Sequence, residues 1–216
     1  MLNKKQVEEL FITLHHLNPN PEGELYSVND YTFLVAVALS AQATDIGVNK
    51  ATKTLFEVAK TPQQMLDLGE EGLIKYVKSI GLYKTKAKNI IKAAKMLVEL
   101  HGGVVPNSQK DLEALPGVGR KTANVVRNIV FGEPTLAVDT HIFRISNRMG
   151  LCKATTPDKM MDKLPKKIPP AFLKDAHHWL ILHGRYICKA RTPECAKCPV
   201  YTLCQYKDKL SQLDRG

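Results

Sequence analysis

Four of the five cysteines lie close together near the end of the chain, with the spacing C-x6-C-x2-C-x5-C. They are Cys188, Cys195, Cys198 and Cys204. Crowded thiolates are typical ligands of soft metals, but zinc ribbons and knuckles use two short C-x2–4-C pairs where this chain has one. Four thiolates without paired knuckles can surround a cuboidal iron–sulfur cluster. The spacing therefore favours an iron–sulfur centre over zinc, which remains the alternative. Cys152 is interpreted as a buried apolar residue.

The N-terminus has none of the features of a targeting segment. Met1-Leu-Asn-Lys-Lys leads directly into a polar helical pattern, without the apolar stretch of a signal peptide or an Arg/Ser-rich presequence. No apolar run approaches the roughly 18 residues that a membrane span needs. We therefore expect a cytoplasmic protein, associated with the nucleoid if bacterial, with no membrane partner. Thiols stay reduced there, which argues against disulfides among the clustered cysteines.

The second segment with chemical potential is LEALPGVGRKTANVV, residues 112–126. Gly117 and Gly119 permit positive φ and a close approach of the backbone to a ligand, and the N–H groups of the following helix can meet an anion. The segment is not a P-loop, because Arg120 separates Gly119 from the lysine, and Thr122 breaks the dinucleotide-binding fingerprint. A helix, a hairpin and a second helix would hold a phosphate backbone without reading its sequence. The alternative is a helix–helix turn with no ligand.

Lys121 and Asp139 are the candidate catalytic residues. Lys121 falls in the first turn of the helix after the glycine turn, where the helix dipole disfavours an ammonium and partial burial would act in the same direction. A lysine amine with a lowered pKa can attack a carbonyl-like carbon and form a Schiff base, although a solvated phosphate contact is the alternative. Asp139, in AVDTHIFR, can stabilise a cationic transition state, or simply cap the helix that carries Ile142 and Ile145.

The elements that must position these residues are helices. Apolar residues recur at intervals of three and four, and no alternating strand pattern is present, so we predict an all-α protein. One expected helix follows Asp30 as its N-cap, and two more span the apolar positions 73–80 and 87–100. A short helix follows Ser108, and the helix after the glycine turn ends at Gly132. Two further helices begin near Asp139 and Thr156, and the last extends from Pro170 to about Ile187. A further helix carries the apolar face from Val7 to Leu17.

The basic charge of the chain is concentrated in its last third. The net charge is +10, and residues 151–216 hold 13 Lys and Arg against 6 Asp and Glu, a surplus of 7. Such a surplus favours a polyanionic partner, because neutralised phosphates release counterions. A basic protein with no such partner is the alternative. No oligomerisation signal stands out, so we expect a monomer.

Taken together, the three segments resemble the endonuclease III family of DNA base-excision repair glycosylases over nearly the whole chain. LPGVGRKTANVV resembles the family's helix-hairpin-helix with its catalytic lysine, AVDTHIFR the segment with its catalytic aspartate, and the cysteine spacing its [4Fe-4S] loop. LSAQATD (39–45) and HHWLILHGRYIC (177–188) are also similar to family sequence. Lys121 further argues against the related adenine-mismatch glycosylases, which lack this lysine.

The resemblance implies a fold of two helical lobes with a DNA-binding groove between them. One is a six-helix lobe, residues 22–132, that ends in the helix-hairpin-helix. The other joins residues 1–21 to 133–216 and carries a [4Fe-4S] cluster on Cys188, Cys195, Cys198 and Cys204. The implied partner is double-stranded DNA with damaged bases or abasic sites. The positions expected to bind DNA are Gln42, Leu82, Tyr83, Gly117, Gly119, Arg120, His141, Arg191 and Lys197.

The implied activity is that of a bifunctional repair enzyme. It would remove oxidised pyrimidines with Lys121 as nucleophile and Asp139 as its acidic partner, and then cleave the abasic site by β-elimination through a Schiff base. The alternatives are a non-catalytic helix-hairpin-helix DNA-binding protein, a monofunctional glycosylase, and a redox-responsive regulator that uses the cluster as a sensor.

Overall fold

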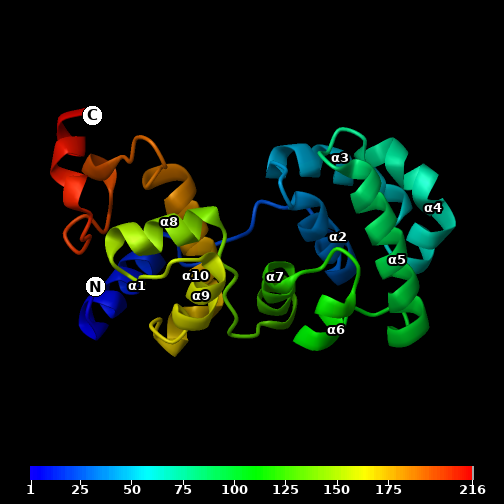
Figure 1. Cartoon of the computed structure of the whole chain (residues 1–216), viewed down its shortest axis with the longest axis horizontal. Helices are drawn as coiled ribbons and strands as arrows, with labels where there is room; N and C mark the ends of the chain where they lie inside the picture. The colour runs from blue at the N-terminus through cyan, green and yellow to red at the C-terminus, as the bar shows by residue number, and fades with distance from the viewer. Residues whose placement is uncertain (216) are drawn as a thin grey trace. The chain divides into compact units, whose positions relative to one another are not determined.

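The chain folds into two compact units built from helices. The computed structural model describes residues 1–215, and no strand occurs among them, which confirms the all-α prediction. One unit is the continuous segment Glu24–Phe131, and the other joins Met1–Gly23 to the residues from Gly132 onward. Figure 1 labels the helices in chain order. No helix within the described part is both long and apolar enough to span a membrane.

The unit Glu24–Phe131 consists of six helices. They are α2 (Asp30–Ser40), α3 (Asp45–Val58), α4 (Pro62–Val77), α5 (Tyr83–His101), α6 (Gln109–Ala114) and α7 (Arg120–Phe131). Helix α2 is apolar on nearly all sides, and it packs against α3, α5 and α7 with most of its side chains buried. Its N-cap is Asn29, whose side chain accepts from the Thr32 N–H, and not Asp30 as predicted.

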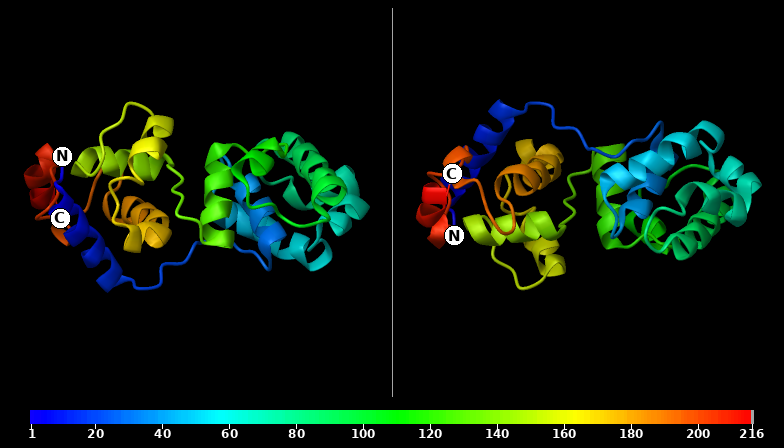
Figure 2. Two further views of the ribbon diagram at one scale, coloured as in Figure 1. Left: turned by 90° about the horizontal axis from the view of Figure 1, so that it is seen from below. Right: turned by 90° about the horizontal axis from the view of Figure 1, so that it is seen from above.

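The other unit is built from the first helix and the C-terminal part of the chain. Its helices are α1 (Lys4–Leu17), α8 (Thr140–Met149), α9 (Pro157–Lys163) and α10 (Pro170–Leu182). The predicted helix from Pro170 to Ile187 is regular only to Leu182, and it continues as one π-helical turn, η1 (His183–Ile187). Two short 3-10 segments follow, η2 (Cys195–Lys197) and η3 (Lys207–Arg215). Figure 2 gives two further views of this unit, with α1 in blue and η3 in red.

An aromatic cluster joins α1 to α10 in the core of this unit. Phe11 is fully buried, with its ring centroid 6.0 Å from that of Phe172 and 6.3 Å from that of Trp179. The Trp179 indole N–H donates to the Asn18 carbonyl just beyond α1, at 2.8 Å. Trp179 is the only tryptophan of the chain. Its fluorescence therefore reports on the unit that contains α1 and α10.

Replacing Phe11 by Ala should destabilise this unit by about 3–5 kcal/mol, because it removes a fully buried ring from between two aromatic partners. The measurement is chemical denaturation followed by Trp179 fluorescence. Ile12→Ala is the matched control, since the side chain of Ile12 is 44% exposed and should cost about 0.5 kcal/mol or less. Equal effects of the two substitutions would contradict this packing.

Candidate functional site

Two buried aliphatic residues fix the glycine turn between α6 and α7. Leu115 and Val118 are both buried, and the Val118 N–H donates to the Leu115 carbonyl at 3.0 Å. Gly117, between them, has φ +83°, and a Cβ at this position would lie 3.1 Å from the Cβ of Asn89 on α5. A Cβ at Gly119 would meet no atom within 4 Å. The turn is therefore anchored on its inner side and open beside Gly119, where a ligand can approach the backbone.

Lys121 is the second residue of α7. Arg120 and Lys121 are both exposed, while Ala123 and Val126 on the opposite face are buried in the unit. The side chain of Lys121 is therefore accessible to solvent. The first turn of α7 places its backbone N–H groups beside the same open face, a position that favours anions.

Asp139 is the N-cap of α8. Its Oδ1 accepts a hydrogen bond from the Ile142 N–H at 2.7 Å, which confirms the capping role considered from sequence. Val138 before it is buried, and the Nδ1 of the buried His177 lies 3.1 Å from the Ala137 carbonyl oxygen. The position of the carboxylate is thus set by the start of α8 and by contacts within its own unit. Lys121 belongs to the other unit.

Two arginines on α8 bind the backbone that leads into the cysteines, and sequence reasoning missed both. Arg144 donates to the carbonyls of Gly184 at 2.6 Å and Cys188 at 3.0 Å, and its burial lowers its pKa. Arg148 donates to the carbonyls of Lys189 at 2.7 Å and Ala190 at 3.0 Å. The four-residue spacing on one helix face was the available signal. This spacing did not indicate that the hydrogen-bond partners of the arginines are carbonyl groups some 40 positions later in the chain.

The predicted DNA contact His141 lies on the same helix. It is half-buried, and its Cβ would lie 3.0 Å from a Cβ added at Gly184. The glycine therefore permits the close approach of η1 to α8. The Arg144 guanidinium lies 3.4 Å from the His141 Nδ1. His141 is accordingly packed in the joint between the two elements, with part of its side chain still accessible.

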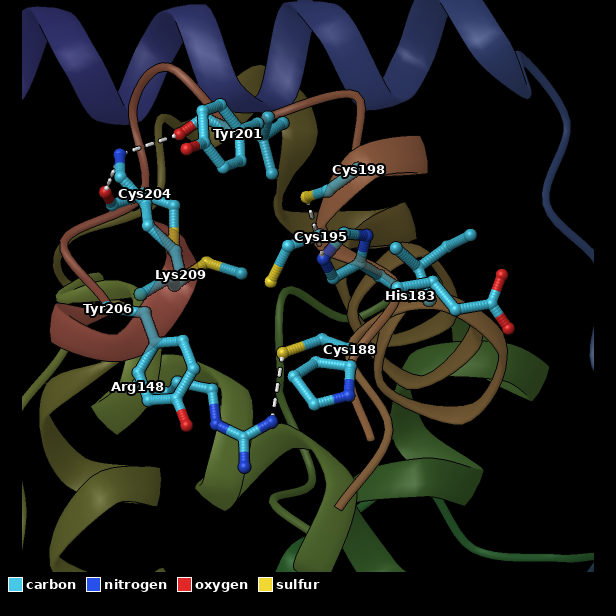
Figure 3. A pocket seen from close by; sticks show the side chains of 14 residues that line it. Arg148, His183, Cys188, Cys195, Cys198, Tyr201, Cys204, Tyr206 and Lys209 are labelled. Carbon is cyan, nitrogen blue, oxygen red and sulfur yellow. Dashed lines mark hydrogen bonds between the residues drawn. The ribbon is translucent and has the colours of Figure 1, made fainter. Parts of the chain in front are cut away.

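The four clustered cysteines line a single pocket, the thiol pocket (Figure 3). Cys188 and Cys195 are buried, and Cys198 and Cys204 are half-buried. Arg148 approaches the Cys188 Sγ at 3.5 Å, and the Nε2 of His183 lies 3.9 Å from the Cys198 Sγ. Burial lowers the pKa of His183 to about 4, so its ring is neutral at neutral pH. Met149 and Val200 are among the apolar residues that complete the lining.

The pocket disfavours several thiolates at once in the absence of a metal. Burial raises the pKa of Cys198 to about 11 and also raises those of Cys195 and Cys204, and repulsion from neighbouring thiolates adds to the effect. A positively charged metal centre would reverse this balance, because it binds and stabilises the deprotonated form. Arg148 and Lys209 place further positive charge at the margin of the pocket.

The spacing of the thiols bears on the kind of metal centre. Among the residues described, no three His, Cys, Asp or Glu side chains are grouped closely enough to hold one metal ion. A zinc site needs its thiolates at about 2.3 Å from one ion. An iron–sulfur core is larger, since each thiolate binds a different iron atom. The four cysteines around one pocket supply the number and type of ligands that an iron–sulfur cluster takes.

The remaining basic candidates lie in the cysteine loop, residues 188–204. Arg191 is exposed, and Lys197 forms an ion pair with the Glu194 carboxylate at 3.3 Å. Lys189 pairs with the same carboxylate. The hydrogen bond from Lys189, followed by that from Lys197, lowers the pKa of Glu194. Both lysines of this loop therefore share one anionic partner.

Gln42, Leu82 and Tyr83 all lie in the unit Glu24–Phe131, at the ends of two helices. Gln42 follows α2 and is exposed, Leu82 precedes α5 and is 64% exposed, and Tyr83 is the half-buried first residue of α5. Leu82 is thus a large apolar side chain on the surface.

The chain matches known proteins over almost its full length. Residues 35–170 match the model of the HhH-GPD superfamily base excision DNA repair protein. Endonuclease III of Rickettsia conorii is 58% identical over 200 residues, which cover 93% of this chain and 95% of the relative. Endonuclease III of Escherichia coli K12 is 53% identical over 209 residues, which cover 97% and 99%.

Solved structures show the same correspondence. A trapped endonuclease III–DNA covalent intermediate, in an estranged-adenine complex, is 42% identical, with a TM-score of 0.89 and coverage of 99% of this chain and 100% of that one. A non-covalent endonuclease III–DNA complex is 41% identical, with a TM-score of 0.90 and the same coverage. With these relatives alike in both sequence and structure from end to end, the chain belongs to the endonuclease III family of the HhH-GPD superfamily of base excision DNA repair proteins.

Proposed function

We propose that the protein is a bifunctional base-excision repair enzyme, an N-glycosylase for oxidised pyrimidines that also cleaves abasic sites by β-elimination. The observation that carries this proposal is the exposed amine of Lys121 in the first turn of α7, directly after the glycine turn. The endonuclease III relatives that match nearly the whole chain support it, and one of the similar structures is a covalent enzyme–DNA intermediate.

Binding to double-stranded DNA rests on the glycine turn and on basic charge. The open backbone at Gly119 and the start of α7 would accept a phosphate of the strand that carries the lesion. Such contacts fix the position of the backbone without reading sequence. His141 and Arg191 would add contacts from the second unit. Lys197 would contribute less than its charge suggests, because Glu194 already neutralises part of it.

The reaction begins with extrusion of the damaged base, which costs least where pairing or stacking is already impaired. The neutral Lys121 amine then attacks C1′, and the N–C1′ bond forms as the glycosidic bond to the base breaks. Asp139 stabilises the developing positive charge at the sugar or accepts a proton from the amine. Opening of the sugar gives an imine, which acidifies the protons on C2′. Loss of one of them expels the 3′ phosphate and cuts the strand.

We further propose that Cys188, Cys195, Cys198 and Cys204 hold a [4Fe-4S] cluster in the thiol pocket. Ligation by all four thiolates would leave no iron coordination position open to substrate, and the bound group would cross-link the cysteine loop. Arg148 also restrains the loop, because it donates hydrogen bonds to the carbonyls of Lys189 and Ala190 at the start of the loop. The loop would present Arg191 to the DNA backbone.

Lys121→Gln should abolish covalent trapping by borohydride on duplex DNA with an abasic site, because an amide cannot form the imine. Binding to the same DNA should persist. Lys110→Gln is the control, since it removes an exposed lysine of the same unit with the same change in charge. A covalent band with Lys121→Gln would assign the chemistry to another amine. The absence of a band with the unaltered protein would favour the monofunctional glycosylase or the non-catalytic DNA-binding protein.

Two substitutions of Asp139 separate its role as the N-cap of α8 from the role of its negative charge in the reaction. Asn is as good an N-cap as Asp, so Asp139→Asn should unfold at nearly the same temperature but excise damaged bases about 100-fold or more slowly. Asp139→Ala should show the same loss of activity and also lose about 1 kcal/mol of stability. Thermal unfolding and single-turnover excision measure the two effects. Full excision by Asp139→Asn would show that the carboxylate acts only as a cap.

Cys204→Ala should lower the iron and acid-labile sulfide content of the purified protein, because it removes one of four ligands. The matched control is Cys152→Ala, which changes the fifth, fully buried cysteine outside the thiol pocket. This control should retain its iron, measured by metal analysis and visible absorbance. Zinc in place of iron in the native protein, or equal iron loss in both variants, would contradict the assignment.

A further inference from the structure

Two non-glycine residues in the described part of the chain have a left-handed backbone conformation. They are Gln42, with φ 56°, and Leu82, with φ 59°. This conformation is unfavourable for a residue with a Cβ, because the Cβ lies too close to the following carbonyl oxygen. Both side chains are exposed, so their own burial does not offset the strain. Strain of this kind persists where the surroundings hold it, and it is concentrated at functional sites.

The two strained residues lie in neighbouring turns. A Cβ added at Gly81 would lie 3.9 Å from the Gln42 carbonyl oxygen, and Gly81 directly precedes Leu82. The helices on which the turns border, α2 and α5, are packed together. The exposed side chains of Gln42 and Leu82 are therefore presented by adjoining parts of one unit, although 40 positions separate them in the sequence.

Lys86 connects the two turns. It lies on α5 one turn after Leu82, and its backbone N–H donates to the Leu82 carbonyl at 3.0 Å. Its Nζ donates to the carbonyls of Leu39 at 2.9 Å and Ala41 at 2.6 Å. Ala41 is the C-cap of α2 and directly precedes Gln42. A cation at the end of a helix binds carbonyl groups that lack a helical partner and is favoured by the helix dipole.

The amine of Lys86 is directed into the protein, unlike those of its neighbours on α5. Lys84, Lys88 and Lys92 are exposed, while Lys86 is half-buried and its burial lowers its pKa. Two charge-assisted hydrogen bonds to carbonyls offset this desolvation. The Lys86 side chain thus ties the backbone that directly precedes Gln42 to α5, the helix that begins after Leu82.

On the basis of the proposed function, we propose that Lys86 is a positioning residue that holds Gln42 and Leu82 together as one preformed wedge for the gap left by an extruded nucleotide. A wedge that is already ordered avoids the entropic cost of fixing two exposed side chains upon DNA binding. Lys86 itself contacts neither the reacting sugar nor the phosphates. It acts through the two residues that it joins.

The test compares two substrates that differ in their need for the wedge. One is a duplex with a thymine glycol paired with adenine, and the other is a single strand with an abasic site, which has no stacked partner to replace. Lys86→Met removes the cation and keeps the aliphatic stem. It should slow single-turnover excision from the duplex about tenfold or more, because a small misplacement of a positioning group is costly. Strand cleavage of the single strand should change less than about twofold.

A matched control and a double variant complete the experiment. Lys92→Met removes an exposed lysine of the same helix and should leave both rates unchanged. Leu82→Ala should slow the duplex reaction alone, and adding Lys86→Met to it should cause little further loss, since both substitutions disable one device. With 2-aminopurine placed opposite the lesion, its rise in fluorescence should be slower with Leu82→Ala and with Lys86→Met than with the unaltered protein.

The outcomes are distinguishable from failure of the proposed function. Equal losses on both substrates with Lys86→Met would overturn the proposal, because they would reflect general instability. Fully additive effects of Leu82→Ala and Lys86→Met would also overturn it, as would an unchanged duplex rate. Absence of both activities in the unaltered protein would instead refute the glycosylase and lyase assignment itself.

Discussion

The hydrogen bonds from the arginines of α8 to the backbone of η1 and the cysteine loop organise the C-terminal unit. They satisfy carbonyl groups at the point where the regular helix α10 gives way to a π-helical turn, and such groups would be costly to bury without partners. The far end of α8 receives two further segments. The Leu2 N–H donates to the Gly150 carbonyl at 2.8 Å, and the Gln205 N–H donates to the Met149 carbonyl at 3.1 Å. Helix α8 therefore positions three features: the segment that leads into α1, the cysteine loop and the Asp139 carboxylate.

This arrangement indicates a structural role for the proposed cluster. A crosslink among the four cysteines would fix the far side of a loop whose near side is held by Arg148. The start of the same helix carries Asp139. Loss of the metal centre would therefore be expected to loosen the support of α8 before it affects any reacting atom. The unit with the glycine turn has its own core around α2 and folds around different contacts.

Local signals in the sequence predicted much of this architecture. Asp139, Ser108 and Thr156 are N-caps as expected, because a cap depends on residues within three positions along the chain. Helix α3 was not assigned, since Ile46 near its start is 84% exposed and interrupts the pattern. Asn29 displaced Asp30 as a cap because it forms a reciprocal bond with Thr32. The π-helical turn, the two arginines and the strained turns depend on contacts between distant segments, which periodicity does not encode.

The carboxylate of Glu194, which lies between two lysines of the cysteine loop, would affect movement along DNA if the loop binds phosphates as proposed. In the free protein it neutralises part of a crowded positive surface and limits like-charge repulsion. A phosphate arriving at this loop would replace one anion by another, so the net gain from each such exchange is small. Weak, readily reversed contacts favour sliding and hopping over long residence at undamaged positions. A repair protein that must inspect far more DNA than it cuts would benefit from a loop whose charge is already partly compensated.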